Sequence, residues 1–257
     1  MNKVLRGCRI DREGCPFCRG HSFEEKTVID DSLANTWELS QRERSWFDER
    51  EGHFCRTCHM SKRVRMLLWS LKKIFPRFNG LHILHLNQTN GLSQALSGAA
   101  SLIETIYLPD RELGAEIHGL SNQDMTRLTF GNSRFDLVVH SETLEHLHDY
   151  ELALSEARRV LKPGGYQIYS IPLLHDRQTR RRIAWDADGK LIHLHPLSTH
   201  GLEEEYPVVW EFGGDFISDR TELIYEIHYD NYLKNKTVFT IVERKASTEL
   251  VSADASD

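Results

Sequence analysis

The segment from Phe135 to Pro172 constrains the fold of this chain more than any other. It begins with an apolar run, Phe135 to Val139, which is typical of a strand buried on both faces of a parallel sheet. Asp149 can then cap a helix whose apolar residues recur every three to four positions. Pro163-Gly164-Gly165 is expected to end that helix, and Tyr166 to Ile171 indicates a second strand. The segment therefore predicts a β-α-β unit.

The connection between the two strands of this unit fixes where a ligand can bind. A right-handed crossover leaves the loop from His140 to Thr143 at the carboxyl end of the first strand. Ligands of open α/β sheets bind at that edge. Glu142, in this loop, is therefore a candidate binding residue.

Length and composition set the remaining limits. A chain of 257 residues can hold one α/β domain and a small accessory module. It contains 40% apolar residues, no apolar run long enough for a membrane span, and no leader sequence. We therefore expect a soluble, cytoplasmic protein. The net charge of −6 argues against a broad nucleic-acid-binding surface.

Four of the five cysteines form two C-x-x-C pairs, Cys15 with Cys18 and Cys55 with Cys58. Two such pairs favour a tetrahedral zinc site, because each pair places two thiolates on adjacent corners. The alternatives are four free thiols or a redox pair. Four thiolates close the coordination shell, so a zinc ion here is expected to be structural. Cys8 has no partner at this spacing and is predicted to be a bystander.

The 36 residues between the two pairs predict an insertion in the zinc ribbon. This insertion carries Trp37, Leu39, Trp46 and Phe47, and we expect them to form a small core around the metal. Residues 1–62 are accordingly predicted to be a zinc-ribbon module.

Residues 63–245 are predicted to form the main domain, and the small, acidic tail at 246–257 is predicted to be disordered. The expected elements of this domain, beyond the β-α-β unit, are listed here in chain order: a helix at 63–75, a strand at 81–86, a helix at 92–96, a strand at 104–108, and two strands at 223–229 and 237–244. The last two should form an antiparallel hairpin.

Three motifs resemble class I S-adenosylmethionine-dependent methyltransferases of the type 11 kind. They are Phe-Asp-Leu-Val-Val at 135–139, Leu144-Glu145-His146, and the stretch from Arg158 to Gly165. The resemblance implies an α/β, Rossmann-like sheet that is parallel except for a C-terminal antiparallel hairpin. It also implies an enzyme that uses S-adenosylmethionine. Residues 124–130 are similar to a further family segment, Asp-x-Thr-x-Leu-Pro-Phe.

The resemblance implies roles for several residues in cofactor binding. Asp124 would face the adenine amino group, unless it caps a helix, and the Met125 amide would meet a ring nitrogen. Asp110 would accept the ribose hydroxyls, unless it is only a turn residue. Glu142 would orient the acceptor or the sulfonium of the cofactor. Gly91 is the one glycine that remains of the three usual in the cofactor loop.

One subset of the family is especially similar: bacterial methyltransferases with an N-terminal zinc ribbon, associated with surface-polysaccharide gene clusters. Gly91-Leu92-Ser93, His200-Gly201 and the stretch from Trp210 to Gly214 carry this resemblance. It implies that residues 173–221 cover the acceptor site and that the acceptor is a sugar or glycan. The three arginines at 180–182 would hold a phosphate or form a solvated basic face.

A hydroxyl acceptor needs a base, and histidine suits this role because its pKa lies near working pH. His200 is the first candidate, followed by His146 and His175. Three functions remain open: a small-molecule or glycan O-methyltransferase, an RNA base methyltransferase, and a non-catalytic binding or scaffold protein that keeps the fold. The last alternative is motivated by the glycine-poor loop. The sequence does not define the acceptor atom or the oligomeric state.

Overall fold

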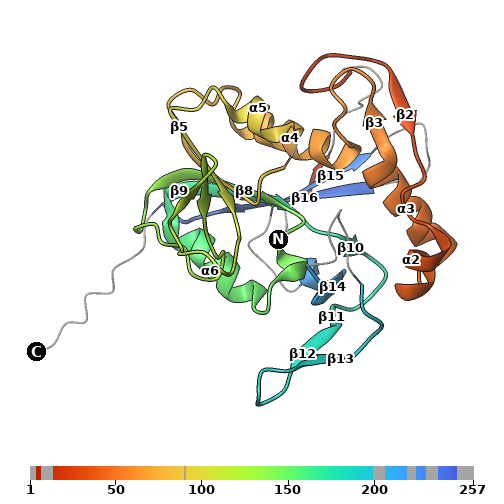
Figure 1. The fold of residues 1–257 in the computed structure, drawn as a ribbon. Helices are drawn as coiled ribbons and strands as arrows, with labels where there is room; N and C mark the ends of the chain where they lie inside the picture. The colour runs from red at the N-terminus through yellow and green to blue at the C-terminus, as the bar shows by residue number, and fades with distance from the viewer. Residues whose placement is uncertain are drawn as a thin grey trace, which may run out of the picture.

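The computed structural model describes residues 4–6, 14–89, 91–198, 206–218, 224–229 and 237–247. A nine-stranded sheet forms the centre of the protein, in the order β1-β15-β16-β9-β8-β4-β5-β7-β6 (Figure 1). The strands are β1 (Val4–Arg6), β4 (His82–Leu86), β5 (Ser101–Ile106), β6 (Glu116–Ile117), β7 (Leu120–Asn122), β8 (Phe135–Ser141), β9 (Leu161–Ser170), β15 (Ile224–Tyr229) and β16 (Thr237–Arg244). Strands β7, β5, β4, β8 and β9 are mutually parallel, and β16 is antiparallel to both β9 and β15. The predicted Rossmann-like fold class and its C-terminal hairpin are confirmed.

Helices cover both faces of the sheet (Figure 1). On one face lie α4 (Lys62–Ile74) and α5 (Leu92–Leu96), and on the other lies α6 (Tyr150–Val160). Strand β8 serves both layers: Leu137 and Val139 pack in the α4 layer, whereas Val138 packs in the α6 layer. This alternation, with both sets buried, explains why the strand reads as a continuous apolar run.

The β8-α6-β9 unit forms as predicted. The Asp149 side chain accepts a hydrogen bond from the Leu152 amide at 2.9 Å and caps α6. The helix ends at Val160, three residues before the expected stop at Pro163. Leu161 already pairs with Phe135, and the ladder resumes at Leu137 after a shift in register.

Other predicted elements shift by a few residues or not at all. Helix α5 has the predicted bounds. Strand β5 begins three residues earlier than expected and ends at Ile106 rather than Leu108. The predicted disordered tail lies outside the described residues from position 248 onward.

The N-terminal module consists of a hairpin and an insertion. Strands β2 (Phe23–Glu25) and β3 (His53–Cys55) are antiparallel, and α2 (Asp31–Thr36) and α3 (Gln41–Gly52) lie between them. The prediction of a core around the metal is wrong. Trp37 and Phe47 instead pack against Leu174 and Val208, which belong to the segment at residues 173–221, called the covering segment below.

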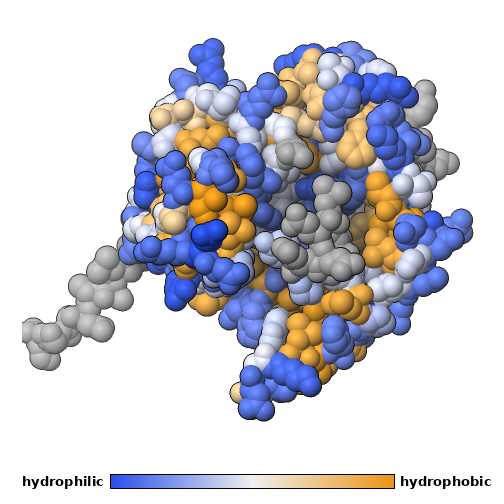
Figure 2. Space-filling view, viewed as in Figure 1, coloured by the Kyte–Doolittle hydropathy of each residue, from blue (hydrophilic) through white to orange (hydrophobic). Residues whose placement is uncertain are grey.

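The covering segment follows β9 and is built of short strands. They are β10 (Leu173–Leu174), β11 (Arg180–Arg181), β12 (Ile183–Trp185), β13 (Leu191–His193) and β14 (Trp210–Gly213), followed by α7 (Asp215–Ser218). The predicted turn joins β12 to β13, with Gly189 in a left-handed conformation (φ 78°). This hairpin projects from the body, and Figure 2 shows apolar surface on it, to which Ile192 contributes.

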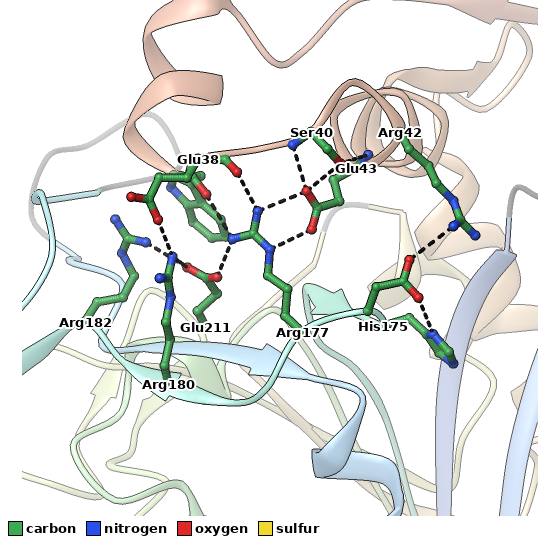
Figure 3. A network of polar contacts seen from close by, with 11 residues as sticks. Glu38, Ser40, Arg42, Glu43, His175, Arg177, Arg180, Arg182 and Glu211 are labelled. Carbon is green, nitrogen blue, oxygen red and sulfur yellow. Dashed lines mark hydrogen bonds and ion pairs between the residues drawn. The ribbon is translucent and has the colours of Figure 1, made fainter.

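A buried network of charges holds the covering segment to the insertion (Figure 3). The Glu211 carboxylate is fully buried and accepts hydrogen bonds from Arg177, Arg180 and Arg182 at 2.7–3.0 Å. Arg177 also donates to both carboxylate oxygens of Glu43 on α3. Burial would raise the pKa of Glu211, but its arginine partners lower it.

Both expectations for the three arginines at 180–182 are therefore wrong. Arg180 and Arg182 are engaged with Glu211, and Arg181 lies over the Trp210 ring and donates to the His148 carbonyl. They form neither a solvated basic face nor an open phosphate site. In the part of the chain that is described, no helix is long and apolar enough to cross a membrane.

Candidate active site and metal centre

A pocket of about 660 Å³ lies at the carboxyl ends of the parallel strands. Its volume is in the range of small-molecule and cofactor sites. Residues that follow β4, β5, β7 and β8 form it together with the covering segment. The lining residues are Leu86, Asn87, Thr105, Ile106, Tyr107, Leu108, Gln123, Asp124, Met125, Thr126, Glu142, Thr143, His146, Leu147, His148, Trp185 and Tyr206. The structure thus brings four of the predicted site residues together: Asp124, Met125, Glu142 and His146.

Gly91 does not line this pocket. It precedes α5 with a φ of 81°, and a Cβ added there would lie 2.8 Å from the Met60 side chain of the zinc module. Only glycine meets both conditions without strain. Asn87, which has a φ of 57°, is the residue of this loop that reaches the pocket. Its amide donates to the Thr105 hydroxyl at 3.1 Å.

Asp110 is also absent from the pocket and is exposed. The reason is the early end of β5. After Ile106 the chain turns, and the buried Asn122 side chain holds the turn by bonding the Leu108 amide and the carbonyls of Leu108 and Arg111. The structure therefore gives no support for a role of Asp110 at the ribose. Tyr107 and Leu108 occupy this side of the pocket instead.

Asp124 both closes a turn and lines the pocket. One of its carboxylate oxygens, Oδ1, accepts hydrogen bonds from the amide and the hydroxyl of Thr126, so the side chain closes a turn rather than capping a helix. The same residue lines the pocket. Met125 is buried in the α6 core layer and also lines the pocket.

Glu142 has a left-handed backbone (φ 51°), and its carboxylate is held from the N-terminal module. Arg50 on α3 donates to both of its oxygens, at 2.7 and 2.5 Å. The hydroxyl of Ser170 adds a third hydrogen bond at 3.1 Å. Sequence reasoning missed Arg50, because no local pattern links two residues 92 positions apart.

Glu145 and His146 follow Glu142 on the short helix η1 (Leu144–His146). Burial, and then the nearby Glu142 carboxylate, raise the pKa of Glu145 well above its usual range. Burial lowers the pKa of His146. Its Nδ1 donates to the Pro207 carbonyl at 3.1 Å, and its Nε2 lies 3.9 Å from the Glu145 carboxyl group. Burial favours the neutral imidazole, which is the form that can accept a proton.

Aromatic rings line the part of the pocket next to the covering segment. Trp185 comes from β12, and its ring centroid lies 4.7 Å from that of His148. Tyr206 and Tyr107 complete this group. His175 is exposed and pairs with Asp176 outside the pocket. His200 lies outside the described residues.

The four predicted zinc ligands converge. The sulfur atoms of Cys15, Cys18, Cys55 and Cys58 all lie within 4.8 Å of one another, and two pairs are 3.5 Å apart. A tetrahedral ion with Zn–S bonds of about 2.3 Å separates its sulfurs by about 3.8 Å. Cys8 lies outside the described residues.

The two cysteine pairs have the same backbone geometry. In the first, Arg19 donates to the Cys15 carbonyl, and in the second, His59 donates to the Cys55 carbonyl, each at 2.8 Å with a left-handed φ near 60°. Burial would raise the pKa of the Cys55 thiol, but hydrogen bonds from the backbone of Cys58 and Thr57 lower it to about 7. Such bonds stabilise thiolate ligands. The cysteines therefore fit a structural zinc ion.

The chain is similar to known proteins over part of its length. Residues 105–169 match the family model of a methyltransferase domain. No curated protein sequence matches the chain. A solved S-adenosylmethionine-dependent methyltransferase from Mesorhizobium loti is 15% identical, with 70% of this chain and 98% of the other covered and a TM-score of 0.43. A 1,6-didemethyltoxoflavin-N1-methyltransferase from Burkholderia thailandensis, solved with its substrate and S-adenosylhomocysteine, is 14% identical, with 87% and 93% covered and a TM-score of 0.44.

The strand order gives the chain a Rossmann-like fold with a pocket at the carboxyl edge of the sheet. Residues 105–169 of this fold match the methyltransferase-domain family. The distinguishing feature of the chain is an N-terminal four-cysteine module whose inserted helices reach both the pocket and the covering segment.

Proposed function

We propose that this protein transfers a methyl group from S-adenosylmethionine to a hydroxyl of a sugar, a glycan precursor or another small acceptor. The observation that carries the proposal is the composition of the pocket. Its strand-end side contains polar groups at the positions where this fold holds its cofactor, and its other side contains Trp185, Tyr206 and two histidines. Aromatic faces beside hydrogen-bonding groups suit the apolar and hydroxylated surfaces of a sugar ring.

The residues that fit the cofactor are Asp124, Met125, Thr105 and Glu142. Asp124 is suited to the adenine amino group and the Met125 amide to a ring nitrogen. Glu142 places a carboxylate near the strand edge, where it complements a sulfonium charge. When bound, S-adenosylmethionine supplies an electrophilic methyl group, so the protein need only align the acceptor and remove its proton.

His146 is the best-supported base among the described residues. It lines the pocket, its Nδ1 donates to the Pro207 carbonyl, and burial lowers its pKa, which favours the neutral form that a base requires. His200 was the first choice from sequence and remains a prediction outside the described part of the chain.

Substitution of each histidine tests these assignments. Replacement of the catalytic base by alanine should lower turnover by about 10²–10⁴-fold and leave S-adenosylhomocysteine affinity almost unchanged. His146→Ala and His200→Ala are compared with His175→Ala, whose histidine is exposed and outside the pocket. Cofactor affinity that falls together with turnover would mark the substituted histidine as structural.

An RNA base methyltransferase is the alternative function. The net charge of −6 argues against it, and so does the engagement of Arg180 and Arg182 with Glu211. Incubation with radiolabelled S-adenosylmethionine and either nucleotide sugars and glycan precursors or ribosomal and transfer RNA distinguishes the two. We expect label in the sugar fraction, and label only in RNA would replace our proposal.

A structural zinc ion completes the proposal. The four cysteines close the coordination shell, so zinc would stabilise the module rather than activate water. We propose that the protein acts in the cytoplasm on a small-molecule or glycan acceptor.

A further inference from the structure

The side chain of Arg50 is 1% exposed, although the residue belongs to an insertion of the zinc module. Besides its two hydrogen bonds to Glu142, Arg50 donates to the Ile171 carbonyl at the end of β9, at 3.0 Å. It also donates to Glu51, its neighbour on α3, at 2.5 Å. The guanidinium thus joins helix α3 to the carboxyl edge of the sheet.

Glu142 depends on such external support. Its left-handed backbone (φ 51°) is costly for a residue with a side chain and persists only where neighbours fix it. The Glu142 amide donates to the Ser170 carbonyl at 3.1 Å, and its carboxylate is held by Ser170 and Arg50. Of these partners, only Arg50 carries a charge and grips both oxygens, which sets the orientation of the carboxylate.

Two guanidinium groups lie beside the carboxylates of Glu51 and Glu142. Arg63, whose side chain is 15% exposed, pairs with Glu51 and contacts the hydroxyl of Ser141. Arg50 contacts both Glu51 and Glu142. Loss of Arg50 would leave one of these carboxylates without its counter-charge in a largely buried setting.

We propose that Arg50 is a positioning residue of the methyltransferase site, which acts by holding the Glu142 carboxylate at the cofactor pocket. The inserted helix α3 is then part of the active-site structure and not an appendage of the zinc module. This inference rests on the proposed function, because it requires that the pocket binds the cofactor.

Calorimetric titration with S-adenosylhomocysteine tests this role. We expect Arg50→Gln to weaken binding by roughly 10- to 100-fold, the range usual when a partner that orients a ligand-binding group is removed. Arg50→Lys keeps the charge but not the two-point grip, and it should recover part of the affinity. Arg44→Gln is the matched control on the same helix, because Arg44 pairs with the exposed Asp31 at the surface and not with Glu142.

A double-mutant comparison separates positioning from general support of the fold. If Arg50 acts through Glu142, adding Arg50→Gln to Glu142→Gln should weaken binding less than threefold further. If the losses of affinity in the two single variants multiply in the double variant, the proposal is overturned. Unchanged S-adenosylhomocysteine affinity in folded Arg50→Gln would also overturn it. If Arg50→Gln does not fold, Arg50→Lys is tested in its place. Zinc content and thermal unfolding show whether each variant is folded. Wild-type affinity of Arg50→Lys for S-adenosylhomocysteine would then contradict the proposal. Failure of the wild type to bind S-adenosylhomocysteine would instead refute the proposed function.

Discussion

Asp124 shows how one side chain can serve both the backbone and the pocket. Its Oδ1 atom is committed to the turn with Thr126, while the residue lines the pocket at the end of β7. The turn therefore fixes the carboxylate before any ligand arrives, and this lowers the entropic cost of binding.

We expect Asp124→Ala to weaken S-adenosylmethionine binding by about 1–3 kcal/mol, because buried donors of the ligand lose their acceptor. Asp110→Ala should have no measurable effect, since Asp110 is exposed and outside the pocket. Calorimetry on both variants, with thermal unfolding to check the Thr126 turn, makes the comparison. A larger loss from Asp110→Ala than from Asp124→Ala would show that the cofactor lies elsewhere.

At the scale of residues, the sequence predicted those pocket residues that directly follow a recognisable strand, and few others. Glu142 and His146 were predictable, because β8 is defined by its own apolar pattern and the site follows it directly. Asp110 was misplaced, because the pattern did not show that β5 ends at Ile106. Arg50 was missed, because its partner is remote in sequence.

The elements outside the sheet are held by charge as much as by apolar packing. The insertion and the covering segment share a small apolar cluster. Glu211 and its three arginines, all in the covering segment, add a polar network in which Arg177 and Arg182 bond the insertion (Figure 3). A buried ion pair adds little net stability over an apolar replacement, whereas removal of one partner is costly. Glu211 is therefore the residue on which this junction depends.

Glu211→Ala should lower the free energy of unfolding by about 3–5 kcal/mol, because the buried Arg182 would lose its charged partner. Glu38→Ala removes a 66% exposed carboxylate from the same network, and should cost no more than about 1 kcal/mol. Urea denaturation measures both. Equal effects of the two substitutions would contradict a central role for Glu211.

The zinc ion proposed for the N-terminal module can also be removed, and its removal tests its structural role. Purified protein should contain about one equivalent of zinc per chain, and Cys55→Ser should abolish it. Because Met60 packs against Gly91, loss of the metal should also loosen the start of α5 and lower the thermal midpoint. Elemental analysis and thermal unfolding with and without chelator make this measurement. Folded, metal-free wild-type protein of unchanged stability would refute a structural zinc.

At the scale of elements, the accuracy of prediction followed sequence separation. The C-terminal hairpin and α5 were predicted to within a residue, because alternation and helical periodicity are local. The packing of Trp37 and Phe47 was predicted wrongly, because their partners Leu174 and Val208 lie far along the chain. A local sequence pattern predicts that one face of a helix or strand is apolar, but it does not predict which distant segment packs against that face.

For the whole molecule, pH stability follows from buried titratable groups. Burial lowers the pKa of His53, His85, His140 and His146, to about 3 for His140. These histidines bind protons less readily in the native state than in the unfolded state, where they take up protons below about pH 6.5. A histidine whose pKa is lowered by folding contributes stability at pH values above its pKa in the unfolded chain. This contribution is lost as the pH falls below that pKa.

Glu145 acts in the opposite direction, because its raised pKa favours the fold at low pH. Four histidines outweigh one glutamate, so the free energy of unfolding should fall between pH 7 and pH 5, by an amount on the order of 1–4 kcal/mol. His140→Gln should flatten this dependence by about one proton. Denaturation at a series of pH values measures it, and a stability that rises toward pH 5 would contradict the burial of these histidines.

The central claim is that S-adenosylmethionine binds at the carboxyl edge of the sheet, between the strand ends and the covering segment. Hydrogen exchange read by mass spectrometry, with and without saturating S-adenosylhomocysteine, tests it most directly. We predict slower exchange in the segments that contribute to the pocket, residues 86–87, 105–108, 123–126 and 142–148. Residues 97–100, which lie between α5 and the amino end of β5 and are mostly exposed, should not change. No protection at millimolar ligand, or protection confined to other segments, would contradict the account.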